Sequence, residues 1–132
     1  MSDSANYDRA TALVHEIGSL VVNDPAYRGS DWDGIAVVTI VEGGTIQISA
    51  YSYRTGDKPK PSLPQGYELD DKFEELCNVM QTPAGGKWKT ALVQIRRDNG
   101  KITIDYEYDN PFRWKVTPQN LDTLPEQMRP GS

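Results

Sequence analysis

The 132-residue chain has few of the residue types on which catalysis and cross-linking depend: it contains one cysteine and one histidine. A single cysteine excludes a disulfide within the chain and fits a reducing compartment. Cys77 lies on the apolar side of a predicted helix, where cysteine acts as a small hydrophobe. His15 is expected to be a solvated helix residue. The patterns HExxH, CxxC and GxSxG are absent, so we expect no enzyme, no catalytic residue, no metal and no cofactor.

The chain also lacks a long apolar run and an excess of basic residues. No run approaches 18 apolar residues, and the N-terminal MSDSANYDRA does not read as a signal peptide, so we expect a cytoplasmic protein. Asp and Glu number 19 against 14 Lys and Arg, which gives a net charge of −5. Such a chain is repelled by nucleic acid and anionic membranes and attracted to basic partners. The same charge is also explained by solubility alone.

Periodicity predicts one α+β domain over residues 1–132, in the order α-β-β-α-β-β-α. The expected sheet is antiparallel and four-stranded, with the helices packed on one face. Residues 34–41, GIAVVTIV, form a continuous apolar run that is typical of a strand shielded on both faces. A switch of apolar face near Ala50 suggests a bulge in the next strand, or tyrosines on its outer face. The predicted segments are helices at 5–22 and 70–81, strands at 34–41, 45–54, 87–97 and 102–109, turns at 42–44 and 82–86, a long mobile loop at 54–67 and a tail with short helical turns at 117–132.

The stretch 98–118, DNGKITIDYEYDNPFRWKVTP, carries the main functional signal. Asp98–Lys101 predicts a type I′ hairpin turn. In the strand after it, the even positions 102–108 are apolar or aromatic, and both tyrosines there are expected in the core. The odd positions Asp105, Glu107 and Asp109 are acidic and share the other face. An acidic strand face adds nothing to a core, so the pattern favours binding over catalysis.

Two sets of residues are therefore candidates for contact with a partner. The first set combines the three strand acids with Arg113 and Trp114, because aromatic rings beside charges at strand ends are typical of binding hot spots. The second set lies on the helix at 70–81. Its members are Asp70, Asp71, Glu74 and Glu75. Two other interpretations of the strand acids stay open: a solvated face, or a metal site completed by oxygen ligands from another strand.

Residues 87–130 resemble the YezG-like group of bacterial immunity proteins. The resemblance rests on Trp88, the DNGK turn, DYEYDNPFRWKVTP and the closing NLDTLPEQMRP, and it does not extend to the loop at 54–67. It implies a cytoplasmic, non-enzymatic α+β protein that neutralises a toxin, often a secreted nuclease, encoded beside it. We therefore expect a protein that occludes the basic active-site groove of such a toxin. The alternatives are a small metal-dependent hydrolase using the strand acids and a homodimeric adaptor.

Overall fold

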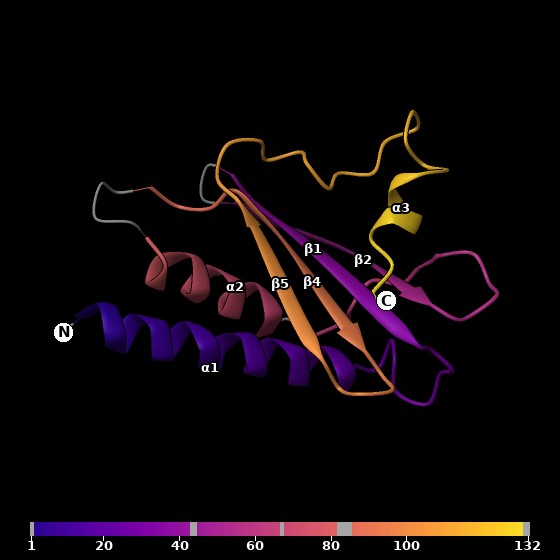
Figure 1. Cartoon of the computed structure of the whole chain (residues 1–132), viewed down its shortest axis with the longest axis horizontal. Helices are drawn as coiled ribbons and strands as arrows, with labels where there is room; N and C mark the ends of the chain where they lie inside the picture. The colour runs from indigo at the N-terminus through magenta and orange to yellow at the C-terminus, as the bar shows by residue number, and fades with distance from the viewer. Residues whose placement is uncertain (1, 43–44, 67, 82–85, 131–132) are drawn as a thin grey trace.

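A five-stranded antiparallel sheet forms the centre of the structure, with strand order β3-β2-β1-β4-β5 (Figure 1). The computed structural model describes residues 2–42, 45–66, 68–81 and 86–130. The α+β class is confirmed, but the four-stranded sheet and the predicted element order are wrong, because a further short strand follows β2. The elements are α1 (Ser2–Val22), β1 (Gly34–Glu42), β2 (Thr45–Tyr53), β3 (Lys60–Pro61), α2 (Glu68–Val79), β4 (Thr90–Arg96), β5 (Ile102–Glu107) and α3 (Leu124–Gln127).

The central strand β1 is buried on both faces, as its continuous apolar run predicts. It pairs in antiparallel register with β2 on one side and β4 on the other, so that Val37 lies opposite Ala50 and Val93. The register with β2 is unbroken from Gly34 to Glu42, so β2 has no bulge. The change of apolar face near Ala50 arises because both faces of the sheet are buried at this end of β2. Ala50 belongs to the helix-covered cluster, and Tyr51 lies on the face away from the helices.

Helices α1 and α2 cover one face of the sheet (Figure 1). They run antiparallel, since Arg9 pairs with Glu75 and Glu16 pairs with Lys72. Their apolar stripes meet the inward side chains of β1 and β4, and burial of this apolar area is the main driving force for folding. The fully buried members of this cluster include Leu13, Ile17, Val21, Ile35, Val37, Phe73, Leu76, Ala91 and Val93.

The second face of the sheet is covered by the segment from residue 111 to residue 130, here termed the C-terminal strap. Trp114 and Met128 of the strap are buried against it, and Leu124 of α3 packs beside them. Tyr53 donates a 2.6 Å hydrogen bond to the carbonyl of Pro125. The prediction that all helices pack on one face is therefore wrong. The sheet needs a second cover because β1 presents apolar side chains on that face too: Ala36, Val38 and Ile40.

The segment at 54–67 is held in place at several points, which the prediction of a long mobile loop did not foresee. Lys60 and Pro61 pair with β2 as β3. The Tyr27 hydroxyl donates to the carbonyl of Ser62, and the buried Asp24 carboxylate accepts from the backbone amides of residues 65 and 66. These contacts connect the end of α1 to the segment that leads into α2.

Four further predictions concern local structure. The hairpin after β4 is wider than the expected two-residue turn, because the amide of Arg96 donates to the carbonyl of Lys101 and four residues lie between them. Tyr108 is 39% exposed, so its predicted place in the core is wrong. The turn predicted at Gly43–Gly44 and most of the helix stop predicted at 82–86 fall outside the described residues.

No helix in the described ranges has the length and apolar character needed to cross a membrane.

Candidate protein-binding surface

The acidic strand predicted at 102–109 forms the outer strand β5, and its alternation is confirmed over Ile102–Glu107. Ile102, Ile104 and Tyr106 pack against the helix-covered cluster. Asp105 and Glu107 have the opposite parity and therefore lie on the face away from α1 and α2. Asp105 is exposed and has no ion-pair partner among the described residues.

The Glu107 carboxylate is engaged in contacts within the protein. Its carboxylate accepts hydrogen bonds from the backbone amides of Asp109 (2.9 Å) and Asn110 (3.2 Å), and the Arg113 guanidinium lies 3.2 Å from Oε1. These amides, and then Arg113, hold the pKa of the Glu107 carboxyl below its usual value. Glu107 thus stabilises the turn that follows β5, and Arg113 neutralises part of the acidic face from within the chain.

The aromatic residues near this turn differ in exposure from the prediction. Trp114 is only 7% exposed and belongs to the core under the strap, with the Arg113 guanidinium 4.7 Å from its ring centroid. Phe112 is 49% exposed and has Lys115 above its ring at 5.1 Å. Trp114 is therefore a structural residue, and the exposed rings of Tyr108 and Phe112 take its place as candidate contacts.

Exposed acidic and aromatic residues follow one another closely in the chain at the end of β5 and just after it. Asp105 and Asp109 are exposed, and the exposed rings of Tyr108 and Phe112 follow within a few residues. We term these four residues the β5-loop surface. Sequence reasoning missed Phe112, although its position between Asn110-Pro111 and a charged residue is typical of an exposed turn.

The second predicted set lies on α2, on the other side of the sheet. Asp70, Asp71 and Glu74 are exposed and form no ion pair within the described ranges. Glu75 instead binds Arg9, which donates from Nε at 2.8 Å and from Nη2 at 2.5 Å. The two acidic sets therefore lie on opposite faces of the sheet. A partner that binds one face contacts only one of the two sets.

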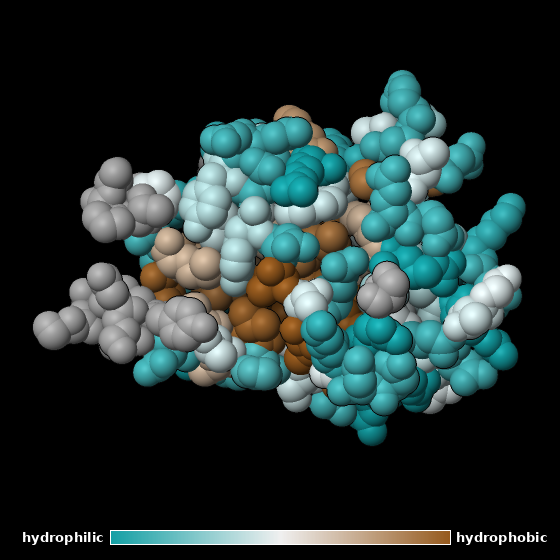
Figure 2. Space-filling view, in the orientation of Figure 1, coloured by the Kyte–Doolittle hydropathy of each residue, from teal (hydrophilic) through white to brown (hydrophobic). Residues whose placement is uncertain are grey.

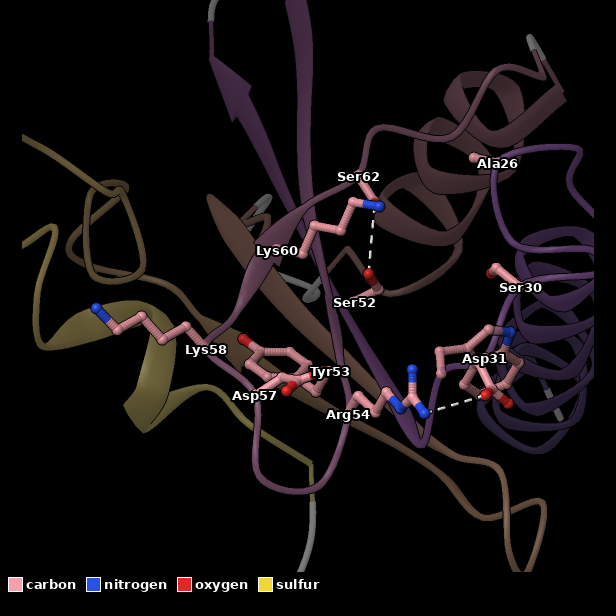
Figure 3. A pocket seen from close by; sticks show the side chains of 11 residues that line it. Ala26, Ser30, Asp31, Ser52, Tyr53, Arg54, Asp57, Lys58, Lys60 and Ser62 are labelled. Carbon is pink, nitrogen blue, oxygen red and sulfur yellow. Dashed lines mark hydrogen bonds and ion pairs between the residues drawn. The ribbon is translucent and has the colours of Figure 1, made fainter.

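A polar cavity of about 270 Å³ lies elsewhere, between the 26–32 connection, the end of β2 and the segment at 57–62 (Figure 3). Arg54 crosses one side of it towards Asp31 at 3.4 Å, and the hydroxyls of Ser52 and Ser62 lie 3.3 Å apart. Neither histidine nor cysteine is among its described lining residues. The basic side chains that line the cavity with these serines are Arg54, Lys58 and Lys60, and no imidazole is among the described lining residues.

Metal-ligating side chains do not converge in the part of the chain that the structure describes. No group of three His, Cys, Asp or Glu residues lies close enough there to hold a metal ion. Burial raises the pKa of the Cys77 thiol, which disfavours the reactive thiolate. The metal-dependent hydrolase alternative therefore gains no ligand set from the described residues.

A scan of the chain against protein-family models finds no match, and a search of curated proteins finds none either. The resemblance of residues 87–130 to YezG-like immunity proteins therefore stays a prediction. What the site can do has to be argued from its own charges, exposure and packing.

Proposed function

We propose that this protein is an immunity protein that acts by binding a basic toxin and occluding its active-site groove. The observation that carries the proposal is the β5-loop surface, a short stretch of chain that exposes two aromatic rings and the carboxylates of Asp105 and Asp109, which have no ion-pair partner among the described residues. Aromatic residues supply most of the binding energy at many interfaces, and acidic groups around them select a basic partner. This surface also lies within the stretch that carries the family resemblance.

The physical mechanism requires no chemistry by the protein itself. A net charge of −5 attracts a basic protein at long range and raises the rate of encounter. Short-range contact by Tyr108 and Phe112 then slows dissociation. A nuclease whose cationic groove is covered in this way cannot bind the phosphate backbone of its substrate. Repulsion from nucleic acid keeps the immunity protein itself off the substrate.

The decisive test uses the toxin domain that this proposal expects to be encoded beside the gene. We expect the wild-type protein to bind that domain and to protect cells that express it. Association is measured at low and high salt for an Asp105→Ser, Asp109→Ser double variant. We expect a several-fold slower association and a weaker salt dependence, because two exposed carboxylates near the contact are lost. Glu107 is left intact because it stabilises the turn.

The matched control removes two exposed acids elsewhere, by Glu42→Ser and Asp122→Ser. The control changes the net charge by the same amount as the Asp105, Asp109 double variant. If the β5-loop surface is the interface, the double variant must slow association more than the control does. A triple variant with serine in place of Asp70, Asp71 and Glu74 tests the acidic residues of α2 in the same assay. If the triple variant slows association and the double variant does not, the interface lies on α2. If the wild-type protein neither binds nor protects, the proposed function is wrong.

The aromatic contribution is tested separately with Phe112→Ala. Phe112 is half exposed, so its truncation leaves the core intact. We expect faster dissociation with little change in association, because an apolar contact acts at short range. Leu63→Ala, at a residue that is 60% exposed and lies outside this surface, is the matched control. Equal dissociation rates for both variants would remove Phe112 from the interface.

A further inference from the structure

Strand β5 leaves one edge of the sheet unpaired. It pairs only with β4, and the described chain places no other strand beside it. The amide of Arg96 donates to the carbonyl of Lys101, and that of Lys89 donates to the carbonyl of Glu107. Since an antiparallel ladder alternates, the odd residues of β5 bond β4. The amides and carbonyls of Ile102, Ile104 and Tyr106 therefore point to the free edge.

The free edge is bordered by apolar side chains. Ile102, Ile104 and Tyr106 are only half-buried, as is Val14 of α1. In Figure 1 β5 lies in front of the rest of the sheet with α1 beside it, and Figure 2 shows hydrophobic surface over the same region. Natural proteins usually protect such an edge with a bulge, a proline or a covering segment, because it can pair with another chain. β5 has no proline and no break in its register with β4.

The sequence of β5 identifies a second copy of this chain as the occupant of the edge. In an antiparallel pair centred on Ile104, each residue meets the residue equally distant on the other side of the centre. Lys101 then meets Glu107 of the second copy, and Ile102 meets Tyr106 of the second copy. Thr103 meets Asp105 of the second copy. The segment KITIDYE is thus complementary to itself in charge, in hydrogen bonding and in apolar contact.

Neighbouring registers lose this complementarity. A pair centred on Tyr106 places Asp105 opposite Glu107 of the second copy, where the like charges repel. A pair centred on Ile102 places Lys101 opposite Thr103 of the second copy and extends each strand into the 97–100 hairpin loop. Only the register centred on Ile104 pairs the whole strand with opposite charges at its ends.

We propose that two copies associate through their β5 edges into a symmetric dimer with a continuous ten-stranded sheet. Paired residues share a face, so the helix layers of both copies lie on the same side. Lys101 is exposed. In the dimer its ammonium group would lie near Glu107 of the second copy, which already forms an ion pair with Arg113 of its own chain. Two six-residue strands make a small interface, so the dimer forms in a concentration-dependent way. This proposal goes beyond the proposed function and does not depend on it.

Sedimentation velocity of the full chain over a range of concentrations tests the proposal. We expect the sedimentation coefficient to rise with concentration as dimer forms. Thr103→Asp introduces two like-charge pairs with Asp105 and should raise the dissociation constant about tenfold. Thr103→Lys introduces two opposite-charge pairs and should lower it by a similar factor at low salt. Thr103 is exposed, so neither variant disturbs the core.

A swap variant tests the register itself. The double change Thr103→Asp, Asp105→Thr keeps the wild-type net charge and restores a threonine opposite an aspartate. We expect it to recover the wild-type dissociation constant. Thr45→Asp on β2, also exposed and distant from this edge in the strand order, is the matched control. Circular dichroism verifies the fold of each variant. A wild-type protein that stays monomeric into the millimolar range, or a dimer that responds equally to Thr103→Asp, Thr103→Lys and Thr45→Asp, overturns the proposal.

Discussion

Asp24 binds three backbone amides and is the residue whose replacement we expect to be most informative. Its side chain is 4% exposed. It accepts hydrogen bonds from the amides of Ala26 at 2.9 Å, Gln65 at 2.9 and 3.0 Å, and Gly66 at 2.8 Å. The carboxylate thus ties the end of α1 to the segment before α2. The perturbation is Asp24→Asn, which keeps the size of the side chain and replaces one acceptor oxygen with a donor.

The expected cost follows from which bonds are lost. With the amide oxygen placed towards Ala26 and Gln65, the new amide nitrogen faces the Gly66 amide, and two donors then oppose each other. Hydrogen bonds to charged groups contribute about 1.5–3 kcal/mol each, and the exposed Gly66 amide recovers part of this by binding water. We expect a loss of about 2 kcal/mol in the free energy of unfolding. For a chain of this length that corresponds to a melting temperature roughly 6–10 °C lower.

Urea unfolding at neutral pH measures the change, with Asp31→Asn as the control. Asp31 lies in the same connection but is exposed, and its ion pair with Arg54 is also exposed, so its loss should cost less than about 0.5 kcal/mol. Hydrogen exchange at the amides of residues 65 and 66 should rise in the Asp24 variant before global unfolding. Equal urea midpoints for the two variants would refute the role assigned to Asp24.

Three other variants examine the turn after β5 and the strap. Glu107 has a folded pKa below its ordinary value, so its contribution to stability is present above that ordinary value and is lost as the pH falls through the folded pKa. Glu107→Gln should therefore lower the urea midpoint near neutral pH and have little effect in strong acid; an equal effect at both would contradict this assignment.

Met128 is 1% exposed, and Met128→Ala should lower the free energy of unfolding in urea by about 2–5 kcal/mol. Gly34→Ala would bring a methyl group within 2.9 Å of Pro130 Cγ and should cost about 1–3 kcal/mol by displacing the end of the strap; a cost below about 0.5 kcal/mol for both variants would show that the strap is not part of the cooperative fold.

The sequence predicted those elements whose signals are local. The apolar run of β1, the helix stripes around Leu13 and Phe73, and the alternation of β5 all follow from the spacing of side chains within one segment. The first helix ends at Val22 as predicted, whereas the other helix boundaries differ from prediction by two or three residues, since helix ends depend on capping and on neighbouring turns.

Features set by contacts between distant segments were not predicted. β3 lies in a proline-rich segment, and its place depends on Asp24 and Tyr27, which are about 40 residues away along the chain. Trp114 stands between two basic residues and resembles a surface residue, yet it is buried because β1 exposes a second apolar face. One signal was available: a strand predicted to be shielded on both faces requires a second covering segment, and the C-terminal residues were the remaining candidates.

The two proposals make opposite demands on one position, which allows them to be separated. In the dimer, the Asp105 side chains of both copies lie near the two-fold axis, so dimerisation would concentrate negative charge on the face proposed to meet a toxin. Thr103→Lys should tighten the dimer but slow association with a basic toxin, because it places a positive charge beside Asp105. Thr103→Asp should weaken the dimer and speed that association. If Thr103→Lys instead tightens the dimer and also speeds association with the toxin, Asp105 is not part of the toxin-binding surface.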